Sequence, residues 1–292
     1  MTKLSKPVSL FIVSALYILA LFAGLIVYAA MPGGLSPLLK FLAADAAATV
    51  VVWLFGAFFK NASMYDPYWS VAPIALIVCF ILLSGKLETT GILYAAVLTF
   101  WGVRLTANWI IGWSGMRHQD WRYTMLREKN PRLWFITNFF GINMMPTLFV
   151  FAGMVPAYFA VTSGGSANAA TYLGAAVCVG ATLLQIFSDA QMRGFRKEPY
   201  NSGKNIETGL WKYSRHPNYL GEVSLWWGVW IIQLSVLPEM WWTLFAPVAM
   251  TLLFVFISIP MMEKRLMESK QGYAEYKRTT SMLVPLPKNR VS

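Results

Sequence analysis

The sequence predicts an all-α membrane protein: a bundle of about seven or eight transmembrane helices with both termini in the cytosol. Three observations support this fold class, namely an apolar composition, long apolar runs and a one-sided distribution of cations. Of the 292 residues, 57% are hydrophobic and only 13% are charged, whereas about a quarter of the residues in a soluble domain are charged. A composition this apolar favours a chain embedded in lipid.

Several apolar runs approach the roughly 20 residues that a helix needs to cross a bilayer. They are residues 8–30, 39–59, 71–85, 89–112, 141–162, 169–190, 219–236 and 240–261. The third run is short, so seven spans is the alternative to eight. No hydrophilic stretch is long enough for a second globular domain, and we expect residues 1–292 to form a single integral membrane domain.

The cationic residues lie almost entirely on one predicted side of the membrane. With the N-terminus inside, the inner segments contain 21 of the 24 Lys and Arg residues. Cytoplasmic loops of membrane proteins carry such an excess, so both termini are expected in the cytosol. The net charge of +11 is therefore attributed to membrane topology, and no nucleic acid partner is expected.

Charged side chains inside the predicted spans need a partner or a function, because each costs about 2.5–3.5 kcal/mol on insertion scales. Asp45 and Arg104 are two such residues in the first half of the chain. Asp45 suits a structural role as well as a functional one. Arg104 either extends its stem toward the inner interface or reaches an anion within the bundle.

Polar residues recur at helical spacing where the run 169–190 leaves the membrane. Gln185, Asp189, Arg193 and Arg196 are spaced so that they share one helix face. An Asp–Arg pair followed by ordinary inner-side cations is the alternative interpretation. The pattern predicts a polar stripe that begins inside the membrane and continues to the cytosolic side.

The next helix begins with polar groups. Asn218 and Glu222 are four residues apart, and Tyr213, Arg215 and His216 come just before them. A helix start with an amide, a carboxylate and flanking cations can bind ribose hydroxyls and phosphates. A capped helix end with interfacial aromatics is the alternative, but a glutamate one turn inside the membrane favours a binding site.

Three sequences carry a family resemblance: LLQIFSDAQMRGFRKEP, GLWKYSRHPNYLGE and GYAEYKRTTSMLVPLP. They resemble the C-terminal region of the steroid 5-alpha-reductase family, and in particular its bacterial branch, the DUF1295 group. The match is strongest over residues 171–287, and NASMYDPYWSVAP and WGVRLTANWIIGWSGMRHQDWRY extend it into the N-terminal half.

The resemblance implies a membrane-embedded, NADPH-dependent reductase in the inner membrane of a bacterium. Such enzymes reduce a carbon–carbon double bond conjugated to a carbonyl in a steroid-like or other lipid-soluble substrate. The cofactor lies in a helical bundle without a Rossmann domain, and the chain has no G-x-G pair and hence no dinucleotide fingerprint. Membrane lipids are the other expected partners, and the oligomeric state is left open.

The resemblance also implies a set of cofactor-binding residues. Carried over by position, they are Gln185, Asp189, Arg193, Arg196, Asn218 and Glu222, with Lys204 near a further family cation. Tyr213, Arg215 and His216 join the predicted set because they lie just before the helix start. Glu263 and Lys264 stand where the reductases have an Arg and a His, which departs from the family pattern.

The catalytic residues depart further from the family. Reductases hold the substrate carbonyl with a Glu and with a Tyr three residues before an Arg. Aligning on Arg104 places Trp101 at the Tyr position and Asp66 close to the Glu position. An indole cannot deliver a proton, so another donor is needed.

Three tyrosines near these positions, Tyr65, Tyr68 and Tyr123, are candidate donors. Hydride transfer to an enone places negative charge on the carbonyl oxygen, and a hydrogen-bond donor there stabilises the transition state. We expect protonated Asp66, or Tyr68 supported by it, to be this donor. Arg104 would contact a cofactor phosphate or the loop that carries Asp66.

Two other functions are considered. The RHPNY stretch resembles the isoprenylcysteine carboxyl methyltransferases, which bind S-adenosylmethionine, and Glu263 supports this alternative because those enzymes carry glutamates in the corresponding late helix. A methyl donor has no phosphates, however, so the polar stripe favours the reductase. A transporter would place its polar groups near the midplane. No metal site is predicted, because His118 and His216 have no partner at ligand spacing.

Overall fold

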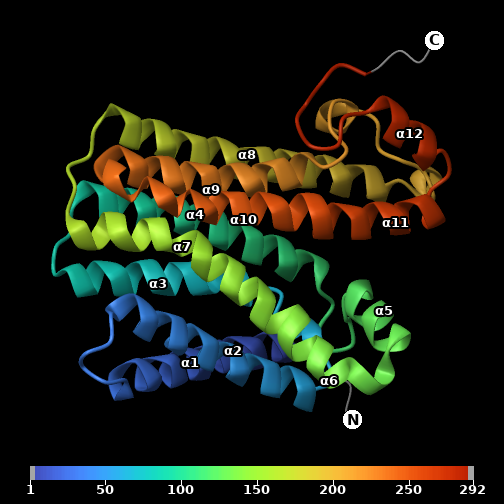
Figure 1. The fold of residues 1–292 in the computed structure, drawn as a ribbon. Helices are drawn as coiled ribbons and strands as arrows, with labels where there is room; N and C mark the ends of the chain where they lie inside the picture. Colours follow the sequence, from blue (N-terminus) through green and yellow to red (C-terminus); the bar gives the residue numbers. More distant parts are fainter. Residues whose placement is uncertain (1–3, 289–292) are drawn as a thin grey trace. The chain divides into compact units, whose positions relative to one another are not determined.

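The computed structural model describes residues 4–288, and over this range the chain forms helices and no β-strand (Figure 1). The predicted all-α fold class is confirmed. The extreme ends, 1–3 and 289–292, which were expected in the cytosol, lie outside the described residues. The chain forms two compact units, residues 1–164 (unit 1) and 165–292 (unit 2). Unit 2 contains the stretch 171–287 on which the family resemblance is strongest.

Unit 1 consists of long helices followed by a region of short helical segments and one further long helix. Its α-helices are α1 (Lys6–Ala30), α2 (Pro37–Phe58), α3 (Tyr68–Ser84), α4 (Thr89–Gly112), α5 (Trp121–Lys129), α6 (Trp134–Ile136) and α7 (Met145–Ser163). A 3-10 turn, Ala62–Met64, precedes α3, and a π-helical segment, Thr137–Met144, leads into α7.

Local sequence signals explain where these helices begin and end. The hydroxyls of Ser5 and Ser36 accept hydrogen bonds from the first turns of α1 and α2, and a proline follows each serine. A serine cap with proline in the first turn is a common helix start. Gly85 ends α3 with a positive φ of 65°, a conformation that glycine adopts without steric cost.

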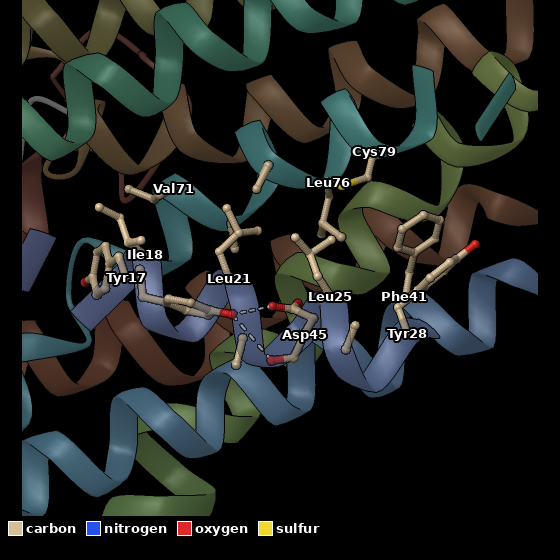
Figure 2. A pocket seen from close by; sticks show the side chains of 16 residues that line it. Tyr17, Ile18, Leu21, Leu25, Tyr28, Phe41, Asp45, Val71, Leu76 and Cys79 are labelled. Carbon is tan, nitrogen blue, oxygen red and sulfur yellow. Dashed lines mark hydrogen bonds between the residues drawn. The ribbon is translucent and has the colours of Figure 1, made fainter. Parts of the chain in front are cut away.

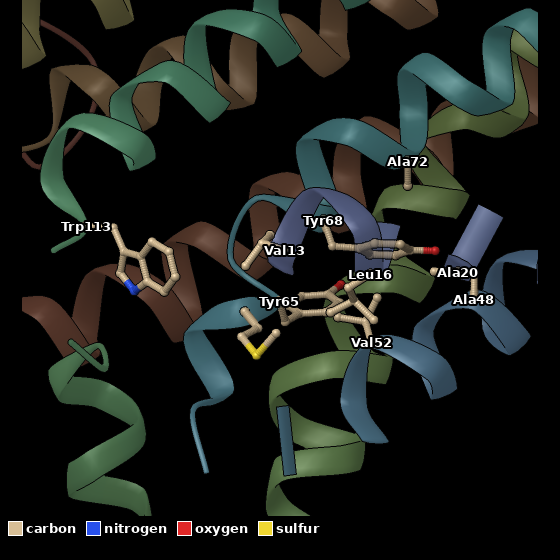
Figure 3. Packing of buried hydrophobic residues seen from close by; sticks show 10 residues of the cluster. Val13, Leu16, Ala20, Ala48, Val52, Tyr65, Tyr68, Ala72 and Trp113 are labelled. Carbon is tan, nitrogen blue, oxygen red and sulfur yellow. The ribbon is translucent and has the colours of Figure 1, made fainter. Parts of the chain in front are cut away.

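The core of unit 1 forms where α1 and α2 meet the chain that leads into α3. The buried members are Val13, Leu16, Ala20, Ala48, Val52, Met64, Tyr65, Tyr68, Ala72 and Trp113 (Figure 3). The Tyr17 hydroxyl donates to the Met64 carbonyl at 2.7 Å and so ties α1 to this chain. The start of α3 is therefore held inside the core, and Tyr68 is buried from the first residue of the helix.

Unit 2 is built on a pair of long helices with a third helical stretch beside them (Figure 1). Its α-helices are α8 (Ala169–Lys197), α9 (Pro217–Val236), α10 (Phe245–Leu253), α11 (Ile259–Ser269) and α12 (Tyr273–Thr279). A π-helical segment, Phe254–Ser258, joins α10 to α11. Asn168 starts α8 with a capping box shared with Thr171, which satisfies backbone donors at the helix end.

Glycines allow α8 and α9 to approach closely. A Cβ atom on Gly228 would lie 2.5 Å from the Cys178 sulfur, and one on Gly221 would lie 2.7 Å from the Ala181 carbonyl oxygen. Small residues at such contacts let helix backbones pack tightly in membranes. This packing sets the register in which polar residues of α8 face those of α9.

Seven helical segments within residues 4–288 are long and apolar enough to cross a membrane. One of them, Ala62–Ser84, contains nearly all of the short third run, residues 71–85. The count of seven is therefore not caused by the loss of that run. Instead α9 is the segment outside the seven, since Asn218, Glu222 and Gln233 lower its hydropathy. Its 20 residues nevertheless extend about 30 Å, and its side chains are largely buried.

Candidate functional site

The predicted polar residues of α8 and α9 face one another in unit 2. Gln185 Nε2 donates to Glu222 Oε2 at 2.9 Å, and Trp226 Nε1 donates to Glu222 Oε1 at 3.1 Å. Glu222 is only 5% exposed, and both its oxygens have donors. Nearer the end of α8, Asn218 Nδ2 lies 3.5 Å from Asp189 Oδ1, at the limit of a hydrogen bond. The structure thus brings these predicted residues together.

Cations follow this polar group toward the end of α8. Arg193, Arg196 and Lys204 are all exposed, and the Lys204 ammonium lies 5.5 Å from the centre of the Tyr200 ring. Burial, and after it the positive charge of Arg196, lowers the pKa of Lys270 below its usual value. Two positive charges near each other repel, and a bound anion would relieve this repulsion.

Two residues predicted to bind a cofactor, Arg215 and His216, have internal partners instead. Arg215 Nε and His216 Nε2 lie 2.7 Å and 3.2 Å from Glu263 Oε1, and Lys277 Nζ lies 2.9 Å from Glu263 Oε2. Burial lowers the pKa of His216 although Glu263 opposes the shift. Because a buried cation needs a paired anion, Glu263 satisfies Arg215, and Arg215 and His216 belong to a network around Glu263.

The C-terminal segment completes this internal network. The Arg215 N–H donates to the Ser281 carbonyl at 2.9 Å, Ser214 Oγ donates to the Leu283 carbonyl at 2.8 Å, and the Leu286 N–H donates to the Tyr213 carbonyl at 3.1 Å. Tyr213 itself has an exposed ring. The stretch before α9 therefore holds the C-terminal segment in place. This arrangement corresponds more closely to the alternative interpretation, in which these residues form a structural helix end.

In unit 1, Asp66 is paired with one of the candidate donors. The Tyr123 hydroxyl donates to Asp66 Oδ1 in a short hydrogen bond. Burial, and then the negative charge of Asp66, raises the pKa of Tyr123 well above its usual value. Tyr123 therefore keeps its proton at neutral pH and can act as a hydrogen-bond donor.

A loop network holds this pair in place. Asn61 Nδ2 donates to the carbonyls of Met116 and His118 at 2.8 and 3.0 Å, and the Asp120 N–H donates to Ser63 Oγ at 2.8 Å. Burial alone would raise the pKa of Asp120, but the hydrogen bonds and charge of Arg122 outweigh it and lower that pKa. Residues 61–66 and 116–123 are thus fixed against each other.

Tyr68 has a different partner from the one expected. Its hydroxyl donates to Asp45 Oδ1 at 2.7 Å, as the dashed lines at Asp45 in Figure 2 show. The expected support of Tyr68 by Asp66 is therefore wrong. Asp66 precedes α3 whereas Tyr68 begins it, so the two side chains enter different surroundings.

The remaining candidates in unit 1 are Tyr65, Trp101 and Arg104. The Tyr65 hydroxyl lies 2.8 Å from Thr147 Oγ1 on α7. Trp101 is completely buried on α4 and lies edge-on to Trp69 with 6.3 Å between ring centres. Arg104 is half-buried on the same helix. Trp101 is therefore a core residue of unit 1.

Sequence reasoning did not include Trp226 or Lys270. Trp226 lies one helical turn after Glu222 and donates to it, so the i, i+4 spacing that selected Asn218 would also have found it. Lys270 is distant from Arg196 in the sequence, and no local pattern connects them. Among residues 4–288, no group of three or more His, Cys, Asp or Glu side chains is arranged to hold a metal ion.

These features define an all-helical, multi-pass membrane protein, because apolar side chains such as Phe11, Ile26 and Phe256 are exposed along spanning helices. The sequence model of the family described as "Protein of unknown function (DUF1295)" matches residues 52–280. The chain belongs to the DUF1295 family.

The chain is also similar to an uncharacterized protein of Schizosaccharomyces pombe, with 24% identity over 222 residues. The similarity covers 67% of this chain and 64% of the relative, so the chain spans about two thirds of the relative's length at most. No solved structure matches the chain.

Proposed function

We propose that the protein is an NADPH-dependent reductase of a carbon–carbon double bond conjugated to a carbonyl, acting on a steroid-like or other lipid-soluble substrate in a bacterial cell membrane. The observation that supports this proposal is the order of groups in unit 2. A polar set on α8 and α9, which includes Asp189 and Asn218, is followed on α8 by the exposed cations Arg193 and Arg196.

The residues of unit 2 fit the chemical groups of NADPH. Asn218 and Asp189, whose side chains lie 3.5 Å apart, offer amide and carboxylate groups of the kind that bond ribose hydroxyls or an amide. Arg196 and Lys270 carry like charges that repel each other, and such a pair of cations suits a phosphate. Lys204 lies in the loop that follows α8 and supplies a further cation.

NADPH would supply the hydride when bound, and the chain would stabilise the charge that develops on the substrate carbonyl. In unit 1 the Tyr123 hydroxyl holds a proton and is positioned by Asp66. If this hydroxyl donated to the substrate carbonyl oxygen in place of Asp66, it would lower the barrier to hydride transfer. The loss of one such donor costs about 2.7–4 kcal/mol in well-studied enzymes. Tyr123, supported by Asp66, is therefore our proposed donor.

The methyltransferase alternative draws on the RHPNY stretch and on Glu263, and the surroundings of Glu263 add no support. S-adenosylmethionine carries positive charges that a free carboxylate would attract. Both oxygens of Glu263 already have cationic partners, Arg215 and Lys277. A methyl donor also has no phosphate for the cations at the end of α8.

Parallel titration of the purified protein with NADPH and S-adenosylmethionine tests the proposal. We expect NADPH alone to bind, and Arg196→Ala to weaken its binding at least tenfold, about 1.4 kcal/mol. Arg278→Ala is the matched control, since Arg278 is an exposed arginine that pairs with Glu275 on α12. Tight binding of S-adenosylmethionine alone, or equal NADPH affinity in both variants, would reject the assignment.

A further inference from the structure

A cavity of about 230 Å³ lies within unit 1, among α1, α2 and α3 (Figure 2). Most of its wall is apolar and includes Leu21, Leu25, Phe41 and Leu76. The wall residues from α1 and α2 all precede residue 52, where the match to the DUF1295 family begins. The cavity is therefore formed largely by a part of the chain that the family match does not include.

One ionisable side chain lines this apolar cavity with an unsatisfied oxygen. Asp45 is 6% exposed, and its Oδ1 accepts the Tyr68 hydroxyl at 2.7 Å. Its Oδ2 has no hydrogen-bond partner among the described residues. A buried polar atom without a partner is unfavourable, so a molecule that supplies this hydrogen bond would bind with a gain in free energy.

The chemistry of Asp45 selects the polar group of such a molecule. An ionised Oδ2 needs a donor, whereas a protonated Oδ2 needs an acceptor. A hydroxyl group satisfies both forms because it donates and accepts. An ammonium group would suit only the carboxylate, and a ketone would suit only the acid.

The size and surroundings of the cavity select the apolar part. Its volume is below the roughly 300–1,000 Å³ of pockets that enclose a whole drug-sized molecule, so it would hold one end of a longer molecule. Three of its lining residues on α1, Ile18, Leu21 and Leu25, are also exposed, at 57%, 44% and 45%. Since α1 is a candidate membrane span, these residues face lipid and offer an apolar path to the cavity.

We propose that this cavity binds the hydroxyl end of a long-chain lipid alcohol, with the hydroxyl on Asp45 Oδ2 and the chain leaving between residues of α1. Binding here is independent of the proposed cofactor group, which lies on α8 and α9 of unit 2. The site would therefore exist whether or not the chain reduces its substrate.

Photo-crosslinking in lipid nanodiscs tests this proposal on the full chain. The probe is 1-dodecanol with a photoreactive diazirine near the hydroxyl end, and the matched probe is dodecane with the diazirine at the same position, which can neither donate nor accept through an oxygen. We expect peptides containing residues 17–28, 41–48 and 68–79 to be labelled about 3- to 10-fold more by the alcohol, as the loss of one hydrogen bond implies. Equal labelling by both probes in the native protein would overturn the proposal.

Variants locate the labelling in the cavity. Ala75→Phe places a ring in the space that Ala75 lines and should remove the excess labelling by the alcohol. Val78→Phe is the matched control, because Val78 lies on the same helix, is 48% exposed and does not line the cavity. Asp45→Leu should reduce labelling by the alcohol to the level of labelling by the dodecane probe. An excess that survives Ala75→Phe would place the alcohol elsewhere and also reject the proposal.

Discussion

The two units bury carboxyl groups in very different surroundings. In unit 2, Glu263 has the cations Arg215 and Lys277, and Glu222 has the neutral donors Gln185 and Trp226. In unit 1, Asp45 has a single hydrogen-bonded oxygen.

The difference separates structural groups from candidate binding groups. A carboxyl group whose oxygens are all satisfied from within holds its neighbours in place, and its loss leaves them without a partner. One with an unused oxygen can accept a ligand at little cost. Glu222, whose two oxygens both have donors, therefore belongs to the base of the proposed cofactor site.

The strongest test of this comparison is Glu263→Ala. It would leave Arg215 as a buried cation without its anion, and breaking a buried pair in this way costs about 3–5 kcal/mol. Thermal unfolding in detergent should show a large loss of stability. The control is Glu275→Ala, which removes an exposed pair with Arg278 and should change stability by less than about 0.5 kcal/mol. Similar effects of the two substitutions would contradict the assigned role of Glu263.

Glu222→Gln should have the next largest effect. An amide in this position presents a donor group to one of two side chains that themselves donate, Gln185 and Trp226. One buried donor is then unsatisfied, at a cost of about 1–3 kcal/mol. Chemical denaturation monitored by tryptophan fluorescence would measure the loss. Native stability in this variant would mean that neither the Gln185 hydrogen bond, which joins α8 to α9, nor the Trp226 hydrogen bond within α9 contributes as expected.

The pH dependence of stability tests the network around His216. Its folded pKa lies below the ordinary value of 6.5, so the neutral form is favoured by folding. The contribution of His216 to the free energy of unfolding is complete above pH 6.5. It is lost as the pH falls toward the folded pKa, and the free energy of unfolding then falls by at most about 1.4 kcal/mol per pH unit. His216→Gln should flatten this slope between pH 7 and 5, whereas His118→Gln, at an exposed position, should retain it. A slope that is unchanged in His216→Gln would assign the loss to other groups.

Asp45→Asn should have the smallest effect on stability. The amide oxygen can still accept the Tyr68 hydroxyl, and the substitution removes a charge whose second oxygen lacks a partner. Stability should change by less than about 1 kcal/mol and can increase. A loss as large as that of Glu222→Gln, measured in the same way, would remove the distinction between the two carboxyl groups.

Features that depend on local periodicity could be predicted from the sequence. Apolar runs of the length of a bilayer predict the helical class, and i, i+4 spacing places Gln185 and Asp189 on one face of α8. Asn218 and Glu222 follow from the same rule on α9. Hydropathy alone does not count α9 among the spans, because residues that serve its contacts with α8 make it more polar.

Partners that are distant in the sequence could not be predicted. Arg215 meets Glu263 across 48 positions, and Tyr68 meets Asp45 across 23. A sequence pattern shows that a buried cation or hydroxyl needs a partner but does not identify it. The partners found here, Glu263 for Arg215 and His216 and Asp45 for Tyr68, lie on other helices and leave no local pattern.

The position of Asn61 has a consequence for expression in eukaryotic hosts. The sequence Asn61-Ala62-Ser63 has the form of an acceptor for N-linked sugar. Asn61 is 2% exposed, and its amide nitrogen, the atom to which the sugar would be attached, donates to two backbone carbonyls. A glycosyltransferase cannot reach this nitrogen in the folded chain, so any glycan found there would mark molecules that were modified before unit 1 had folded.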